Sequence, residues 1–191
     1  MGTIQDDFFE IIKRNKFHLF PVTAATNGEC NCGVKDCASP GKHPLKHFRW
    51  KHLASNNPEQ VQEWWSRVGE INVALTTGRW SKEHQKFLVV VDVDTPKHKI
   101  LSMLPETLSY RTGKRGHHLW FWSKREIPNS ASSLMEKVDI RGTNGYVVIP
   151  PSTHVNGNEY IFENDLKDIA VLPDWVYETL KARKKEVKIP T

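Results

Sequence analysis

The sequence predicts one α+β domain, or a closely related α/β domain, in which a mainly antiparallel sheet carries helices on its outer face. The 191 residues are enough for one compact domain with its own core. Short apolar runs alternate with turns that contain Gly, Pro or Asn, which is typical of strands joined by hairpins. Stretches with helical spacing of apolar residues occur near both ends of the chain, so helices are expected to flank the sheet.

The first part of the chain supplies two expected helices and one strand. Residues 4–13 place apolar side chains at helical spacing. An apolar run that begins at Phe17 predicts a strand, and we expect Pro21 to end it. Asn57 followed by proline predicts the start of a second helix, which we expect to run to about Arg67.

The rest of the chain predicts mainly strands, with polar turns between them. The expected elements are, in order, a strand over residues 71–78, a turn over 79–86, a strand over 87–94, a short helix over 100–104, a hairpin of residues 107–112 and 117–122, a second hairpin of residues 138–142 and 146–151, a strand over 158–162 and a terminal helix over 173–180.

Composition and charge limit the class of protein. Hydrophobic residues make up 38% of the chain, and no apolar run approaches the roughly 20 residues that a membrane helix needs. The N-terminal segment carries acidic residues before its apolar positions, the wrong order for a secretory signal, so we expect a cytoplasmic protein without membrane partners. The net charge of +5 favours a polyanionic partner, although the basic residues 181–188 contribute part of it as an expected solvated helix end.

Two carboxylates end the most apolar strand. Side chains alternate along a strand, so Asp92 and Asp94 lie on one face with Cα atoms about 6.5 to 7 Å apart. Aspartates that end a strand in solvent are the competing interpretation. However, residues 87–91 are apolar enough for a central strand covered on both faces, whose end opens into a cleft where carboxylates repel one another. Mg²⁺ or Mn²⁺ would relieve this repulsion.

A third acid follows in the segment VDIRG. Asp139 again stands at the end of an apolar step, and Arg141, two residues later, lies on the same face of that strand. An aspartate that caps a turn is the alternative. Three carboxylates beside an arginine are typical of two-metal phosphoryl or nucleotidyl transfer.

A basic turn separates the two strands of the first expected hairpin. Lys114 and Arg115 stand between two glycines, and His117 and His118 then lie on opposite faces of the next strand. Such a turn can present backbone N–H groups and cations to a triphosphate. A solvent-exposed charged hairpin tip is the alternative, and His118 shares a face with Trp120, so it is also compatible with a packed core histidine.

All three cysteines lie in one short loop. Cys30, Cys32 and Cys37 are followed by His43 after a Ser-Pro-Gly turn. Three thiolates and one imidazole match a closed tetrahedral zinc site, although the spacing differs from the common pair of two-residue knuckles. A disulfide is the competing interpretation, but it would leave one thiol unpaired and would require an oxidising compartment.

The order of these motifs resembles the catalytic domain of the bifunctional primase-polymerases, within the archaeo-eukaryotic primase superfamily, as found in plasmids, phages and mobile elements. The resemblance covers most of the chain. The motifs that carry it are, in order, GKHP (41–44), Trp50, NPEQVQEWW (57–65), NVALTTG (72–78), VVVDVD (89–94), LPETLSYRTGKRGHHLWF (104–121), VDIRGTNGYVVIPPSTH (138–154), Gly157, Tyr160 and LPDWV (172–176).

The resemblance implies roles for individual residues. Asp92, Asp94 and Asp139 would bind two catalytic Mg²⁺ or Mn²⁺ ions, and His118, which directly precedes LWF, would contact the phosphates of the incoming nucleotide. Arg115 stands where the family usually has a second glycine, which leaves the backbone geometry of the turn open. The further candidate nucleotide-binding residues are Arg141, Lys114, Arg115, Lys42, Thr76, Gly78, Ser152 and His154.

The resemblance also implies a domain organisation. A palm similar to an RNA-recognition motif would occupy residues 81–165, after a small N-terminal α/β unit over residues 1–80. That unit would contain a loop over residues 28–44 that binds one structural Zn²⁺. A C-terminal helix and tail would follow over residues 166–191.

The function implied is that of a DNA-dependent nucleotidyltransferase, which synthesises primers or extends DNA during replication of a plasmid, phage or mobile element. Its partners would be a single-stranded DNA template, a primer strand and NTP or dNTP, with a helicase or a helical accessory domain as further candidates. Three alternatives stay open: a gap-filling repair polymerase of the same superfamily, a DNA-binding module without catalysis, and an unrelated metal-dependent nuclease.

Overall fold

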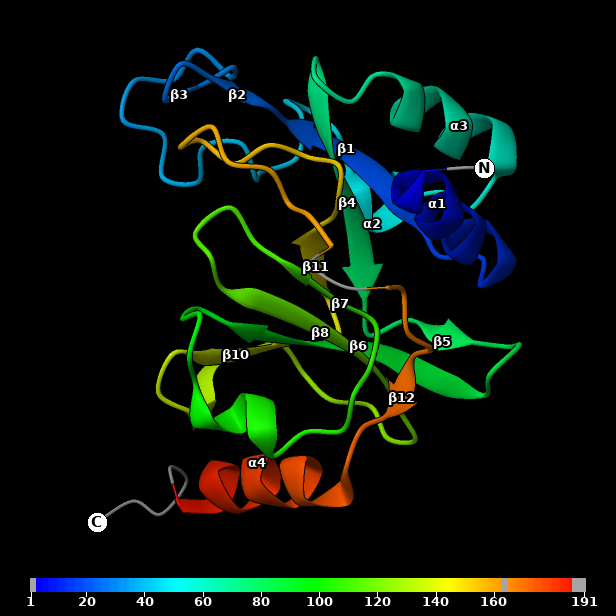
Figure 1. Ribbon diagram of the computed structural model, residues 1–191, viewed down its shortest axis with the longest axis vertical. Coiled ribbons are helices and arrows are strands. Elements are labelled where there is room, and N and C mark those ends of the chain that lie inside the picture. Colours follow the sequence, from blue (N-terminus) through cyan, green and yellow to red (C-terminus); the bar gives the residue numbers. More distant parts are fainter. Residues whose placement is uncertain (1–2, 163–164, 187–191) are drawn as a thin grey trace.

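The computed structural model describes residues 3–162 and 165–186. Figure 1 shows helices α1 and α3 beside a small sheet in the upper half, and helix α4 below a larger sheet in the lower half. The elements are, in chain order, α1 (Ile4–Arg14), β1 (Leu19–Thr23), β2 (Ala25–Thr26), β3 (Glu29–Cys30), α2 (Trp50–Leu53), α3 (Pro58–Ser66), β4 (Ile71–Thr77), β5 (Trp80–Ser81), β6 (Lys86–Val93), the 3₁₀ helix η1 (Lys99–Ser102), β7 (Ser109–Arg111), β8 (His117–Ser123), β9 (Ser130–Met135), β10 (Val138–Arg141), β11 (Gly145–Val148), β12 (Ala170–Val171) and α4 (Asp174–Glu186). The predicted α+β class with mostly antiparallel sheets is confirmed.

Both predicted N-terminal helices begin at capping residues. The Thr3 hydroxyl accepts a hydrogen bond from the backbone N–H of Asp6 at 3.2 Å, and the Asp6 carboxylate accepts one from the N–H of Thr3 at 2.8 Å. In α3 the Asn57 side chain accepts from the N–H of Gln60 at 3.0 Å, and Pro58 occupies the first turn. Residues next to each helix in the sequence therefore determine where it starts.

The upper sheet has the order β1-β4-β11, and all of its pairs are antiparallel. The central strand β4 is buried along its whole length. Pro21 lies inside β1, opposite Val73, so the expectation that Pro21 ends this strand is wrong. The strand tolerates proline because β1 stands at the edge of the sheet order, where a missing N–H need not interrupt a ladder.

The lower sheet has the order β12-β8-β6-β10-β9, with β5 paired to β6 and β7 paired to β8. Strand β6 lies between β8 and β10. Its residues Leu88 and Val90 belong to one buried cluster, and Val89, Val91 and Val93 belong to a second. The strand is thus covered on both faces, as its apolar sequence predicts.

The first cluster joins the upper and lower halves. Phe8 of α1 is fully buried, with ring centroids 5.7 Å from Trp120 of β8 and 4.8 Å from Phe162. The second cluster lies on the opposite face of the lower sheet, where Val176 of α4 and Ile100 of η1 are fully buried. Phe8 therefore packs α1 against the lower sheet through Trp120, and α4 covers the far face of that sheet.

The prediction that residues 138–142 and 146–151 form a hairpin is wrong. Strand β10 pairs with β6 and β9 in the lower sheet, whereas β11 pairs with β4 in the upper sheet. The link between them is held by other segments: Thr143 N–H donates to the Ile127 carbonyl at 2.8 Å, and the Thr77 hydroxyl donates to the Gly142 carbonyl at 2.8 Å. The chain thus crosses between sheets instead of turning back on itself.

The structure differs from the sequence prediction in two further segments. The structure adds β9, whose sequence SASSLM lacks alternation of apolar and polar residues. Residues 158–162 form only isolated bridges, with Glu159 opposite Thr153 and Ile161 opposite Arg111. Both segments lack a clear period-two pattern of burial, which is the signal that marks strands in sequence.

The terminal helix α4 begins at Asp174, as predicted, and extends to Glu186. Residues 187–191, which include the end of the basic run, lie outside the described residues. Across residues 3–162 and 165–186, none of the helices combines the length and apolar character that crossing a bilayer requires.

Replacing Phe8 with alanine tests the packing of α1 against the lower sheet. Phe8→Ala should lower the free energy of unfolding by about 3–5 kcal/mol, because it leaves a cavity in the first buried cluster beside Trp120 and Phe162. Urea denaturation followed by tryptophan fluorescence measures this change. Glu10→Ala, on the exposed face of the same helix, is the matched control and should cost no more than about 1 kcal/mol. Equal losses in the two variants would contradict the packing described.

Candidate active site

Three neighbouring strands place three functional side chains in one row. The register sets Asp92 of β6 directly opposite His118 of β8 on one side and opposite Asp139 of β10 on the other. Directly opposite residues share a face of the sheet. The carboxylates that sequence reasoning singled out are therefore brought together, with the histidine at the end of the row.

Arg141 bridges the two acids of this row. Its Nη2 atom lies 2.8 Å from Asp92 Oδ2 and 2.8 Å from Asp139 Oδ2, and its Nε lies 3.1 Å from Asp92 Oδ2. Burial alone would raise the pKa of Asp92, but the charges of His118 and Arg141 outweigh it and hold this pKa well below its ordinary value. Asp92 is consequently an anion held between the guanidinium group of Arg141 and the ring of His118.

Asp94 stands just beyond the end of β6. Its backbone N–H donates to the Lys137 carbonyl at 3.0 Å, and its side chain is exposed. Partial burial and the negative charges of Asp92 and Asp139 raise its pKa. In the part of the chain that the structure describes, no hydrogen bond or ion pair holds this carboxylate. A cation at this place would therefore be stabilised.

A buried tyrosine fixes the ring of His118. The Tyr110 hydroxyl donates to the Val148 carbonyl at 2.8 Å, so it accepts from the N–H at Nδ1 of His118, also at 2.8 Å. The opposite nitrogen, Nε2, lies 3.3 Å from Asp92 Oδ1. Both ring nitrogens thus have defined partners, and Nε2 faces the acids.

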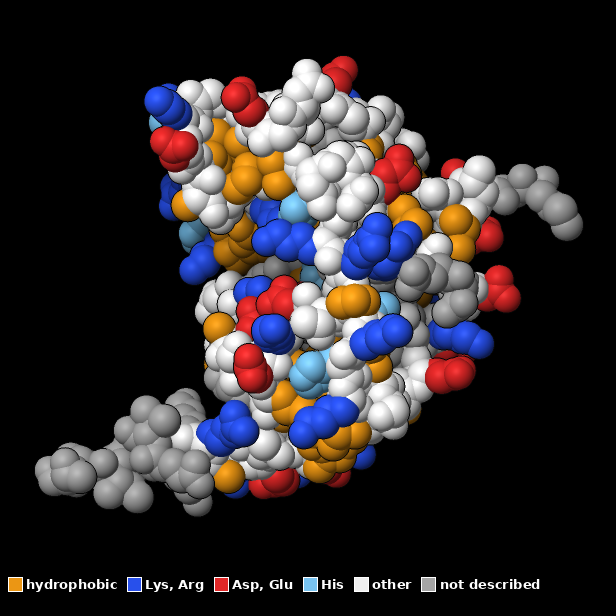
Figure 2. Space-filling model, turned by 60° about the vertical axis from the view of Figure 1, so that its left-hand side comes forward, with side chains coloured by type: hydrophobic (Ala, Val, Ile, Leu, Met, Phe, Trp, Pro, Cys, Tyr) orange, Lys and Arg blue, Asp and Glu red, His pale blue; other side chains and the backbone are white. Residues whose placement is uncertain are grey.

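A cavity of about 290 Å³ opens beside this row. Six of the residues predicted from sequence line it, namely Asp92, Asp94, His118, Arg141, Lys114 and Lys42. Burial lowers the pKa of Lys42, and the charges of Lys114 and Arg141 act in the same direction, while Asp92 and Asp94 oppose them. Figure 2 shows acidic side chains among basic ones at the hollow between the two halves. The site therefore combines carboxylates with cations in one cleft.

The basic turn approaches the sheet closely. A Cβ added to Gly116 would lie 2.2 Å from the Val93 carbonyl oxygen, and one added to Gly113 would lie 2.1 Å from His154 Cβ. Between them, Arg115 has φ +67°, a region that favours glycine. The turn thus keeps its tight shape despite the arginine, and Lys114, but not Arg115, lines the cavity.

Asp139 does not line this cavity, and its carboxylate accepts from the Ser132 N–H at 2.8 Å. Four further predicted residues also lie outside the cavity lining and support the backbone around it. The Thr76 N–H donates to His18 O at 3.0 Å, and the Ser152 hydroxyl accepts from Val73 N at 3.0 Å. A Cβ on Gly78 would lie 2.2 Å from Thr143, so the strand end requires glycine. His154 packs against the basic turn, as its contact with Gly113 shows.

Sequence reasoning missed several residues of the site. Tyr110 could have been found, because the first hairpin places it directly opposite His118. The missed residues that line the cavity stand in loops or, like Tyr146, in β11, a strand whose pairing with β4 the sequence does not predict. They include Ser39, Asn129, Asn144, Tyr146 and Tyr160.

The cysteine loop forms a second cluster. The ligand atoms of Cys30, Cys32, Cys37 and His43 all lie within 4.8 Å of one another, and no disulfide joins the three cysteines. His43 Nδ1 lies 2.9 Å from the Pro44 carbonyl, so it carries the proton, and Nε2 faces Cys30 Sγ at 3.4 Å. This donor set could bind zinc.

The surroundings of Cys30 favour its thiolate form. Burial alone would raise its pKa, but hydrogen bonds from the backbone of Gly41 and Cys32 and the contact with the Thr23 hydroxyl lower it to about 6. The thiolate is the form that binds metals. Among residues 3–162 and 165–186, this is the one group of potential metal ligands that converges in this way.

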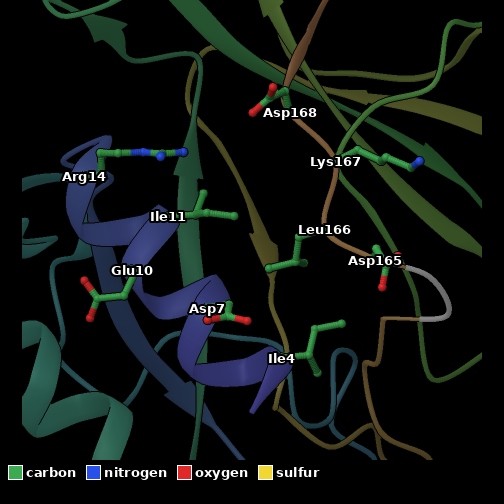
Figure 3. Close-up of a pocket in the computed structure, with 9 residues that line it drawn as sticks. All are labelled: Ile4, Asp7, Glu10, Ile11, Arg14, Asp165, Leu166, Lys167 and Asp168. Carbon is green, nitrogen blue, oxygen red and sulfur yellow. The ribbon is translucent and has the colours of Figure 1, made fainter. Parts of the chain in front are cut away.

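A larger hollow of about 590 Å³ lies elsewhere, between α1 and residues 165–168 (Figure 3). Its charged side chains include Asp7, Glu10, Arg14 and Lys167, which come from separate segments and carry both signs. None of the residues predicted from sequence lines it. The cavity beside Asp92 is therefore the better candidate for chemistry, although it is smaller.

Comparison with protein families gives one match. The family described as bifunctional DNA primase/polymerase, N-terminal, matches residues 9–175. The matched range contains the acid row, the basic turn and the Cys₃His cluster. Comparison with curated proteins gives no significant match.

Replacing one ligand tests the zinc cluster. The protein purified under reducing conditions should hold about one zinc per chain, and Cys37→Ser should weaken zinc binding by more than about 100-fold. Competition with a chromogenic chelator measures the affinity. Lys35→Ala, exposed in the same loop, is the control and should bind zinc as the unaltered protein does. Unchanged affinity in Cys37→Ser would contradict the ligand assignment.

Proposed function

Because the chain belongs to the bifunctional DNA primase/polymerase family, we propose that it is a DNA-dependent primase-polymerase. It would add nucleotides from NTP or dNTP to a 3′-hydroxyl group on a single-stranded DNA template, as part of DNA replication. The observation that carries the proposal is the row of Asp139, Asp92 and His118 across three strands, beside a cavity lined by cations.

The acid trio would hold the two catalytic ions. Asp92, Asp94 and Asp139 offer hard oxygen ligands, and no side chain of the described residues pairs with the Asp94 carboxylate. Mg²⁺ or Mn²⁺ bound there would lower the pKa of the attacking hydroxyl and offset charge on the leaving oxygens. Arg141, which bridges Asp92 and Asp139, would exchange part of these contacts for phosphate.

The cations of the cavity would position the triphosphate. Lys42, Lys114 and Arg141 line one hollow with His118, whose Nδ1 is held by Tyr110 and whose Nε2 would exchange its contact with Asp92 for the ligand. In the reaction, the 3′-oxygen forms a bond to the α-phosphorus and the bond to the bridging oxygen breaks. Pyrophosphate leaves, and the hydroxyl proton passes to solvent.

The lower sheet would serve as the palm. The acids lie on β6 and β10, at its centre, and α4 covers the opposite face. The palm would not be continuous in sequence, because β11 joins the upper sheet although β10 immediately precedes it. We therefore propose that template and primer meet the cleft between the two sheets.

Neutralising one acid tests the catalytic proposal. Asp92→Asn keeps the shape of the side chain but removes the charge, so it should lower nucleotide incorporation at least about a thousand-fold. Incorporation of labelled NTP and dNTP on single-stranded DNA, with and without a primer, measures the activity. Template binding, followed by fluorescence anisotropy, should change little, and Asp168→Asn, an exposed aspartate, should behave as the unaltered protein.

The same assay separates the alternatives. Synthesis only from a supplied primer would indicate a gap-filling polymerase, and template binding without incorporation would indicate a DNA-binding module. Degradation of DNA without triphosphate would indicate a nuclease. Asp92→Asn activity within tenfold of the unaltered protein would reject the assigned role of the acid.

The two adjacent histidines provide a matched pair for the phosphate role. His118→Ala should raise the KM for the nucleotide by about tenfold or more, because a hydrogen bond to a charged group is lost. His117→Ala, on the opposite face of β8, should leave the KM nearly unchanged. Steady-state primer extension at varied dNTP measures both. Equal effects of the two substitutions would count against His118 as a phosphate ligand.

A further inference from the structure

One residue connects the cysteine cluster to the candidate active site. Lys42 is the immediate neighbour of the zinc-ligand candidate His43, and it lines the same cavity as Asp92 and Lys114. Ser39, three residues earlier in the same loop, also lines this cavity. The loop therefore faces the potential metal ion on one side and the active-site cavity on the other.

The contacts within this loop converge on the metal-ligand atoms. The Gly41 N–H donates to Cys30 Sγ at 3.5 Å, and the Val34 N–H donates to Cys32 Sγ at 3.5 Å. From the end of β3 at Cys30 to α2, the loop has no helix and no strand longer than an isolated bridge. The sulfur atoms therefore hold part of this loop.

The base of the loop is anchored on the upper sheet. The buried amide of Asn72 donates to the Gly41 carbonyl at 2.9 Å, and the Thr23 N–H donates to the His43 carbonyl at 2.9 Å. These anchors reach the backbone on both sides of Lys42. They leave the turn that contains Ser39, whose carbonyl accepts from Lys42 N–H at 3.2 Å, to be held by the cluster.

We propose that a zinc ion bound by Cys30, Cys32, Cys37 and His43 positions Lys42 for the triphosphate, so that occupancy of the zinc site sets nucleotide affinity. This inference rests on the proposed function of the cavity. It gives the cysteine loop a role in binding nucleotide in addition to its structural role. Lys42 shares the cavity with the like charges of Lys114 and Arg141, so its ammonium group must be held there against their repulsion.

The test combines zinc removal with a substitution. Equilibrium binding of dATP, in Mg²⁺ and without template, is measured for the unaltered protein and for Lys42→Ala, each with zinc and after zinc removal. Mg²⁺ prefers oxygen ligands and does not replace zinc at thiolates. Lys46→Ala, exposed a few residues later, is the control and should match the unaltered protein.

The effects of zinc removal and of Lys42→Ala on the free energy of dATP binding are expected not to add. Zinc removal should weaken dATP binding by the unaltered protein about tenfold, and Lys42→Ala should do the same with zinc bound. Zinc removal should then cause no further loss in Lys42→Ala. Losses that multiply, or zinc removal without effect, would overturn the inference while dATP binding itself still supported the proposed function. If the zinc-loaded protein fails to bind dATP, both are rejected.

A second measurement covers the case in which zinc-free protein unfolds. Coupling is reciprocal, so saturating dATP should tighten zinc binding by the unaltered protein by the same factor, about tenfold. In Lys42→Ala this gain should disappear. A gain that persists in Lys42→Ala would show that zinc acts through folding of the whole domain and would overturn the role of Lys42.

Discussion

Repulsion between carboxylates is the constraint on which the site depends. Asp92 and Asp139 lie opposite each other on neighbouring strands, and Asp94 stands at the end of the same strand as Asp92. Such a group is stable in a partly buried cleft only beside positive charge. Arg141 supplies part of it through ion pairs with Asp92 and Asp139, whereas burial and the charges of Asp92 and Asp139 raise the pKa of Asp94.

The surrounding structure follows from holding these charges in place. Tyr110, fully buried, fixes the ring of His118 and is itself fixed by the carbonyl of Val148 in the upper sheet. Gly113 and Gly116 let the basic turn come close enough to bring Lys114 to the same cavity. The upper half of the molecule thus contributes to the site through backbone contacts and through the cysteine loop.

The sequence predicts the parts of the site that lie on regular strands. The alternation in β6 and β10 puts Asp92, Asp139 and Arg141 on one face, and the clustered cysteines indicate a metal site without knowledge of the fold. It does not predict which sheet a strand joins, because pairing depends on distant segments. For this reason β10 and β11 were expected to form a hairpin, although they lie in different sheets.

The same limit applies to the buried polar residues Ser152 and His154, which were predicted to line the cleft but support the backbone.

The most direct test of the central claim is anomalous scattering at the manganese edge from crystals grown with Mn²⁺ and a non-hydrolysable dNTP. The account predicts manganese about 2.0–2.2 Å from the carboxylate oxygens of Asp92, Asp94 and Asp139, with Arg141 turned to phosphate. Bound nucleotide without manganese at these carboxylates would contradict it.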